Sequence, residues 1–74
     1  MRKAPGRPTL PPVEDRAAIR KAAGLTQAIL AFRIGVSPSS ITLWETGKSN
    51  PQGLTRDAYA RALVKLQKEQ EAAE

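Results

Sequence analysis

Residues 24–48 read GLTQAILAFRIGVSPSSITLWETGK, and this stretch decides the fold. Thr26 and Ser37 are of residue types that cap the beginning of a helix, and Gly35 and Gly47 are of the type that ends one. The pattern therefore predicts two short helices joined by a tight turn. Such a pair can place its second helix in a groove of DNA.

The apolar spacing indicates which faces of these two helices are buried. The first helix runs to about Ile34, and the second covers about 37–46 with Pro38 at its first position, where proline is favoured. Apolar residues three or four positions apart share one face of a helix. The residues that we expect to face inward are Leu30, Ala31, Ile34, Ile41 and Trp44.

The flanking sequence predicts two more helices and contains no strand pattern, so the fold class is all-α. The first helix covers about 13–23, with Glu14 and Asp15 at its positive end and Gly24 as its stop. The last helix begins after an N-cap at Thr55. One apolar stripe runs along it, made of Tyr59, Ala62, Leu63 and Leu66.

Both ends of the chain are expected to lie outside the packed domain, which covers 13–68. Residues 1–12 contain four prolines, which restrict the backbone and remove hydrogen-bond donors. We expect them to form a flexible basic arm. Residues 69–74 have no apolar face and are expected to form a polar, frayed tail.

The composition excludes several classes of function. The 74 residues include no cysteine and no histidine, so we expect no enzyme, no metal site and no cofactor. The formal net charge of +5 favours an anionic partner, nucleic acid first. No apolar run is long enough to span a membrane, there is no signal-peptide pattern, and no small-molecule ligand is indicated. These features predict a cytoplasmic, nucleoid-associated protein.

From about Ile19 to Leu66 the chain resembles the lambda repressor/Cro-like, or XRE-type, family of helix-turn-helix domains. The matching residues, in order, are Arg20, Gly24-Leu-Thr-Gln27, Leu30-Ala31, Ile34-Gly-Val-Ser37, Ile41, Trp44-Glu45, Gly47-Lys48 and Pro51. The resemblance implies a compact bundle of four or five helices. In this chain the fifth helix is absent or is replaced by an extended fourth helix.

The resemblance also implies which residues contact double-stranded DNA. Family members read bases from the exposed face of the motif's second helix, and the positions that match are Pro38, Ser39, Ser40, Thr42 and Leu43. Contacts to phosphate, which position a protein without reading sequence, are expected from Gln27, Arg33, Ser37, Lys48 and Ser49. The alternative for all of these residues is a plain solvated surface. The base-reading face has no Arg, Asn or Gln, so the strong bidentate base contacts are missing.

Two oppositely charged residues resemble a structural ion pair of the same family. Arg20 and Glu45 are expected to join the first helix to the end of the third. We assign this pair no role in contacting DNA.

The N-terminal arm carries a short basic motif. Gly6-Arg7-Pro8 resembles the core of an AT-hook, a type of arm that lies in the minor groove. Arg2, Lys3 and Arg7 are therefore expected to add backbone or minor-groove contacts. The alternative is a tail that only adds nonspecific affinity.

Two apolar features fall outside the expected core. One is a patch on the outer face of the helix that ends at Ile34, made of Ala28, Ile29 and Phe32. Either the arm covers this patch through Leu10 and Pro11, or the patch binds a partner or a second copy. The other is a stripe formed by Ala60 and Val64, which is either a dimer seam or edge packing.

Together these features predict a sequence-specific transcriptional regulator that binds double-stranded DNA. We expect a repressor that acts as a homodimer and inserts the helix over about 37–46 in the major groove. The alternative is an antitoxin-like or accessory module that binds a second protein through Ala28, Ile29 and Phe32.

Overall fold

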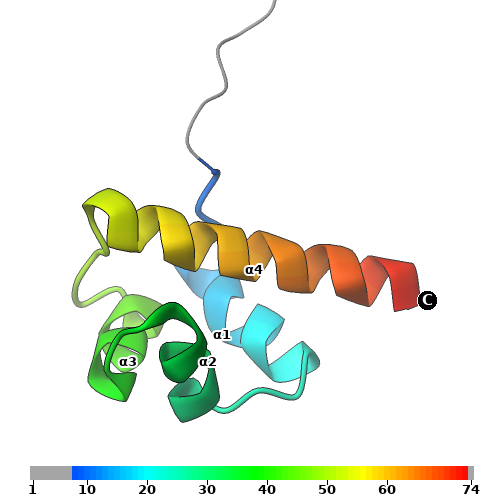
Figure 1. Cartoon of the computed structure of the whole chain (residues 1–74), viewed down its shortest axis with the longest axis horizontal. Coiled ribbons are helices and arrows are strands. Elements are labelled where there is room, and N and C mark those ends of the chain that lie inside the picture. Colours follow the sequence, from blue (N-terminus) through cyan, green and yellow to red (C-terminus); the bar gives the residue numbers. More distant parts are fainter. Residues whose placement is uncertain (1–7, 74) are drawn as a thin grey trace, which may run out of the picture.

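The computed structural model describes residues 8–73, which form four helices and no strand. The helices are α1 (Val13–Ala22), α2 (Gln27–Ile34), α3 (Pro38–Thr46) and α4 (Gly53–Ala73). The three short helices lie together on one side of the long α4, which crosses them and extends beyond them at its C-terminal end (Figure 1). The predicted all-α fold is thus confirmed, with an extended fourth helix and no fifth helix in the described range.

Local capping explains where α2 and α3 begin and end. The hydroxyl oxygen of Thr26 accepts a hydrogen bond from the backbone N–H of Ile29 at 3.1 Å, and Ser37 accepts one from Ser40 at 3.3 Å. The glycines that follow the two helices have left-handed backbones, with φ of 78° and 76°. A residue with a side chain rarely adopts this conformation, so the two glycines determine where α2 and α3 end. The predicted boundaries of α2 and α3 are confirmed.

The predicted beginning of α4 is wrong. The helix begins at Gly53, so Thr55 lies inside the first turn and is not the N-cap. The helical bonding is already established there, because the N–H of Arg56 donates to the carbonyl of Gln52 at 3.1 Å.

The C-terminal end of α4 also extends past the expected end of the domain near Lys68. The helix continues to Ala73. Gln70 Nε2 donates to the backbone carbonyl of Ala22 at 2.9 Å, which attaches the last turns of α4 to the end of α1.

One core joins all four helices. α3 packs on α1 and α2, and α4 packs across the same two helices. The aromatic rings of Trp44 on α3 and Tyr59 on α4 meet with centroids 4.8 Å apart. The buried cluster consists of Ile19, Leu30, Ala31, Ile41, Trp44, Tyr59, Leu63 and Leu66. Nearly all of the expected inward-facing residues are in this cluster, and Ile34 and Ala62 pack against it while partly buried.

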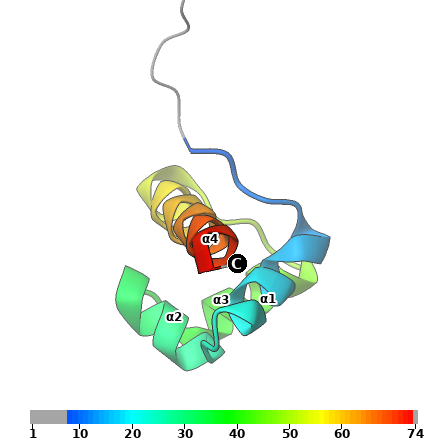
Figure 2. The same ribbon diagram turned by 90° about the vertical axis from the view of Figure 1, so that its right-hand side faces the viewer.

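Residues 8–12 lie against the helices. Arg56 Nη1 donates to the carbonyl of Pro8 at 2.9 Å, Leu10 packs against the core, and Pro11 is buried. The segment reaches α1 on the side away from α2 (Figure 2). Leu10 and Pro11 therefore do not cover the outer face of α2, where Phe32 is 86% exposed.

Candidate nucleic-acid interface

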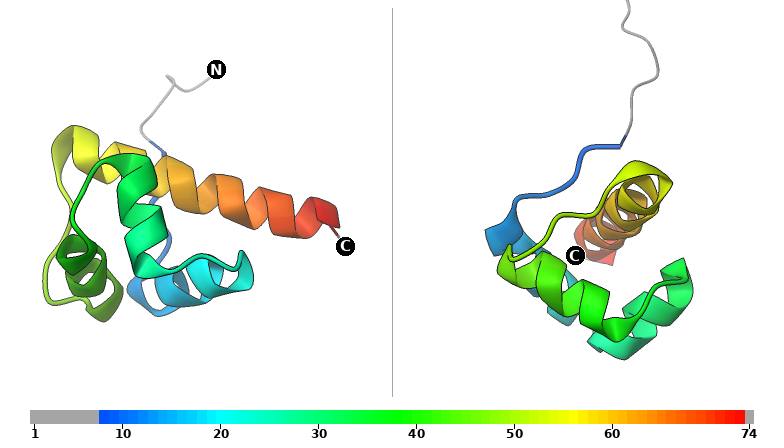
Figure 3. Two further views of the ribbon diagram at one scale, coloured as in Figure 1. Left: turned by 60° about the horizontal axis from the view of Figure 1, so that its bottom comes forward. Right: turned by 90° about the vertical axis from the view of Figure 1, so that its left-hand side faces the viewer.

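The outer face of α3 mixes hydroxyl and apolar side chains and carries no charged side chain among the base-reading candidates. Pro38, Ser39, Thr42 and Leu43 are exposed, whereas Ile41 and Trp44 on the opposite face are buried. Two views of the bundle show α3 at its edge, beside α2 and clear of the C-terminal half of α4 (Figure 3). The core thus fixes α3 from one side and leaves its other side open to a partner.

Two of the DNA-contact candidates, Ser37 and Ser40, take part in the cap at the N-terminal end of α3. Ser37 Oγ lies 3.2 Å from Ser40 Oγ and accepts the backbone N–H of Ser40. Ser40 is accordingly only half-exposed, unlike the other four base-reading candidates. The structure therefore gives both serines a structural task at the first turn of α3.

A chain of hydrogen bonds connects α1, α2 and α3. Arg20 binds Glu45 through two bonds, Nε to Oε2 at 2.6 Å and Nη2 to Oε1 at 3.0 Å. Gln27 Nε2 also donates to Glu45 Oε1 at 3.0 Å. Gln27 Oε1 in turn accepts the hydroxyl of Thr42 at 2.8 Å. The ion pair expected from the sequence is present, and it is continuous with two of the DNA-contact candidates.

The ion pair is largely removed from solvent. The side chains of Arg20 and Glu45 are 9% and 5% exposed. Burial opposes the charged form of Glu45, but the hydrogen bonds from Arg20 and Gln27, with the nearby positive charges, outweigh it and lower the pKa of Glu45. The hydrogen bonds that Arg20 donates to Glu45 raise the pKa of Arg20, against a smaller opposing effect of burial. Both groups therefore stay charged at neutral pH.

Gln27 occupies the first position of α2, where backbone N–H groups at the positive end of a helix favour anions. Its side chain is held by Glu45 and Thr42, and it keeps one of its two amide hydrogens for another acceptor. A phosphate oxygen is an acceptor of the right kind. The geometry is compatible with the phosphate contact that the family resemblance implies.

The remaining phosphate candidates lie in two places. Lys48 and Ser49 are exposed just past α3, and their backbone N–H groups donate to the carbonyl of Leu43 at 3.0 and 3.4 Å. Arg33 lies six positions after Gln27, about 9 Å along the helix axis. It lines a hollow between α2 and α4 with Lys65 and Leu66 and others. The structure brings Lys48 near the end of α3 and places Arg33 at the far end of α2.

Arg16 is a buried arginine on α1 that the sequence analysis did not single out. Its Nε donates to the carbonyl of Pro11 at 2.8 Å, and its Nη1 donates to the carbonyl of Trp44 at 3.0 Å. These bonds tie α3 to α1 and to the segment before α1. A signal was available, since Arg16 lies one turn before Arg20 on the same face, but an exposed arginine has the same spacing.

The predicted patch on α2 is open to solvent. Phe32 is 86% exposed and Ile29 is 45% exposed, and Ala28 is exposed as well.

The arm residues Arg2, Lys3 and Arg7 lie outside the described residues.

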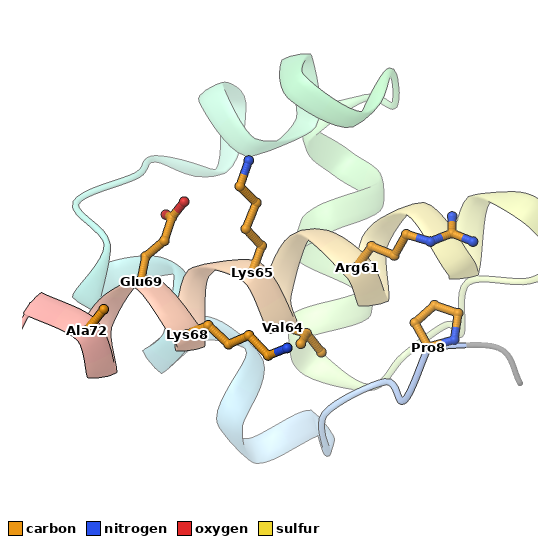
Figure 4. A pocket seen from close by; sticks show the side chains of 7 residues that line it. All are labelled: Pro8, Arg61, Val64, Lys65, Lys68, Glu69 and Ala72. Carbon is orange, nitrogen blue, oxygen red and sulfur yellow. The ribbon is translucent and has the colours of Figure 1, made fainter. Parts of the chain in front are cut away.

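The predicted stripe on α4 divides into two environments. Ala60 is fully buried within the chain, so it does not belong to a surface seam. Val64 is half-buried and lines a hollow of about 450 Å³ on the outer face of α4. Figure 4 shows Val64 near Pro8, with basic side chains around the hollow. The residues that line it are Pro8, Arg61, Val64, Lys65, Lys68, Glu69 and Ala72.

No helix within residues 8–73 combines the length and the apolar character needed to cross a membrane. Residues 8–73 also contain no group of three or more acidic side chains placed to hold a metal ion.

Comparison with known proteins agrees with the geometry. A family model described as Helix-turn-helix (HTH_3) matches residues 17–67, which include all four helices apart from the ends of α1 and α4. Searches of curated proteins and of solved structures give no match. Since the match covers well over half of the chain, the protein belongs to the XRE-type, lambda repressor/Cro-like family of helix-turn-helix DNA-binding domains.

Proposed function

We propose that this protein is a sequence-specific regulator of transcription, a repressor that inserts α3 in the major groove of double-stranded DNA. The observation that carries the proposal is the exposed outer face of α3, formed by Pro38, Ser39, Thr42 and Leu43 on a helix whose other face is buried. Hydroxyl groups on such a face bond base edges or phosphates, and apolar atoms contact the thymine methyl.

The phosphate contacts flank this face. Gln27 at the beginning of α2 and Lys48 just past α3 lie at the two ends of the motif, and Ser49 follows Lys48. Arg33 and Ser37 are secondary candidates, because Arg33 lies by α4 and Ser37 caps α3. Contacts from Arg2, Lys3 and Arg7 in the arm would add backbone or minor-groove affinity.

The proposed active form is a homodimer. A single small domain covers few base pairs, so two copies on adjacent half-sites supply the specificity that one lacks. Two exposed surfaces are candidates for the dimer contact: the α2 patch of Ala28, Ile29 and Phe32, and the α4 hollow that Val64 lines. Sedimentation of Phe32→Glu and Val64→Glu separates them, because only the variant at the dimer contact becomes monomeric.

Selection from random duplex DNA at near-physiological salt tests the function. An enriched inverted repeat would support a dimeric, sequence-specific regulator, and a single short site would support a monomeric one. Salt-sensitive binding without any enriched sequence would contradict the proposal.

A second candidate function rests on the exposure of Phe32. An antitoxin-like or accessory module would bind a second protein through the α2 patch. Phe32→Glu then abolishes capture of that protein while DNA binding is unchanged. Leu54→Glu is a matched control, since Leu54 is 87% exposed on the first turn of α4 and belongs to neither surface. Loss of DNA binding by folded Phe32→Glu alone would instead assign the patch to a DNA-competent dimer.

A further inference from the structure

The hydrogen-bond chain that ends at Thr42 has a fixed direction. Arg20 can only donate, and an ionised carboxylate such as Glu45 can only accept. Gln27 must therefore turn its Nε2 group toward Glu45, at 3.0 Å, which leaves its Oε1 facing Thr42. An amide oxygen can only accept, so the hydroxyl of Thr42 is the donor in the last bond.

A second neighbour of Thr42 imposes the same direction. The hydroxyl oxygen lies 3.3 Å from the backbone carbonyl of Pro38, which is also an acceptor only. The hydroxyl has one hydrogen, and both protein groups within reach of it are acceptors. The hydrogen is therefore held inside the protein, mainly by the shorter bond to Gln27 at 2.8 Å. What Thr42 offers to the outside is its oxygen lone pairs.

We infer that Thr42 is a specificity-determining residue that selects an amino-bearing base, adenine or cytosine, on the DNA strand it faces. The inference rests on the proposed function, in which α3 lies in the major groove. In that groove adenine and cytosine present amino donors, whereas guanine and thymine present carbonyl acceptors. The outward-facing acceptor of Thr42 therefore bonds to the amino group of adenine or cytosine and is repelled by the carbonyl oxygen of guanine or thymine.

The selection extends to the orientation of a base pair. Each A·T or G·C pair has one amino group and one carbonyl group in the major groove, on opposite strands. Thr42 therefore does not separate A·T from G·C, but it separates each pair from its reversed form. The expected signature is one operator position that accepts adenine and cytosine alike and disfavours thymine and guanine.

A free hydroxyl would not give this signature. Serine and threonine hydroxyls that rotate freely can donate or accept, so they bond to either kind of base. If the Thr42 hydroxyl turned its hydrogen toward the DNA, Gln27 Oε1 would lose its donor. On bound DNA, which keeps water from this face, an unpaired amide oxygen is costly, and that cost opposes the turn.

The experiment compares operator selection by the wild-type protein with selection by three variants. Thr42→Val removes the oxygen but keeps the shape and the methyl group, and Thr42→Ser keeps the oxygen. Thr46→Val is the matched control, because the hydroxyl of Thr46 also donates to α3 carbonyls, at 3.0 and 3.2 Å, one turn further on.

The wild-type protein and Thr42→Ser should prefer adenine or cytosine over thymine or guanine at one position by about tenfold, the size expected of one hydrogen bond. In Thr42→Val this preference should fall to within about twofold, and in Thr46→Val it should persist. A thymine or guanine preference that Thr42→Val abolishes, or identical operators for the wild type and Thr42→Val, would overturn the inference and leave the proposed function intact. No enriched operator for the wild type would overturn both.

The free protein offers a test that needs no DNA. The side-chain amide of Gln27 gives its own pair of ¹H–¹⁵N signals, which respond to both of its hydrogen bonds. Thr42→Val should shift these signals and Thr46→Val should not. Unmoved signals in Thr42→Val would show that Thr42 does not donate to Gln27, and the inference would fail.

Discussion

Arg20 on α1 and Glu45 on α3 form a two-bond ion pair, with distances of 2.6 and 3.0 Å, across 25 positions of sequence. The pair joins the first helix to the helix that is proposed to enter DNA. Because the same carboxylate also accepts a hydrogen bond from Gln27, it holds the two helices of the motif together as well. Glu45 thus contributes to the orientation of α3, together with the bond from Arg16 and the core contacts of Ile41 and Trp44.

Loss of this acid should strongly destabilise the fold. Glu45→Gln leaves the buried guanidinium of Arg20 without a counter-charge, and breaking a buried pair in this way costs about 3–5 kcal/mol. Urea unfolding followed by circular dichroism measures the change in free energy. The double variant Arg20→Met/Glu45→Leu is the control, since it removes both charges and should recover part of the loss. A loss below about 1 kcal/mol would place the pair among exposed ones.

The stability should also fall in acid because of Glu45. The pKa of Glu45 in the folded state lies below its usual value of 4.5, so the folded state favours the charged form. The charged form of Glu45 therefore adds to the free energy of unfolding. This stabilisation is fully present above about pH 4.5 and is lost as the pH falls through the pKa of Glu45 in the folded state. Unfolding free energies measured from pH 7 to pH 3 should decline less steeply for Glu45→Gln. Equal slopes for the two proteins would show that other groups cause the decline.

Tyr59 should make the protein sensitive to alkali. Burial raises the pKa of its hydroxyl from 10.0 to about 12, and the hydroxyl has no hydrogen-bond partner among the described residues. As the pH rises, Tyr59 loses its proton in the unfolded chain before it does so in the folded one. Its contribution to the free energy of unfolding is therefore fully present below pH 10 and falls by about 3 kcal/mol as the pH rises toward 12.

Tyr59→Phe separates this effect from general alkaline unfolding. It removes an unpaired buried hydroxyl while keeping the ring that contacts Trp44, so stability at pH 7 should be unchanged or slightly higher. The decline above pH 10 should become shallower in the variant. Equilibrium unfolding at pH 7 and at pH 11 is the measurement, and a clear loss at pH 7 would show that the hydroxyl is paired.

Two kinds of DNA contact should respond differently to substitution. Lys48→Ala should weaken binding to all sequences alike, because a phosphate contact is lost. The slope of the logarithm of the binding constant against the logarithm of the salt concentration should become smaller by about one. Ser39→Ala should leave nonspecific affinity intact and relax the preference at one operator position. Titrations of both variants against operator and random duplexes, at several salt concentrations, distinguish them. The same effect of both variants on every duplex would contradict the assignment of Ser39 to base reading.

The sequence predicted those elements whose signals are local. Thr26 and Gly35 mark the two ends of α2 by their own conformational preferences, and the apolar spacing identified the buried face of each helix. The Arg20–Glu45 pair was found through a family resemblance, because nothing local links residues that far apart.

The features that were missed depend on how distant parts of the chain meet. The sequence around Thr55 contains a good capping residue, but α4 begins two residues earlier, at Gly53, where the backbone has a φ of 60°. The burial of Arg16 and the bond between Gln27 and Thr42 exist only once α3 has packed on α1 and α2. Sequence periodicity carries no information about such contacts.

If Thr42 reads the operator as inferred, its bond to Gln27 limits how operator preference can change. A new side chain at position 42 must give the Gln27 amide another donor, or leave an unpaired oxygen beside the carboxylate of Glu45. Libraries selected for new operators should therefore yield changes at positions 27 and 42 in pairs. If α3 enters the groove as proposed, the set of operators open to this domain depends on a side chain of α2 as well as on α3.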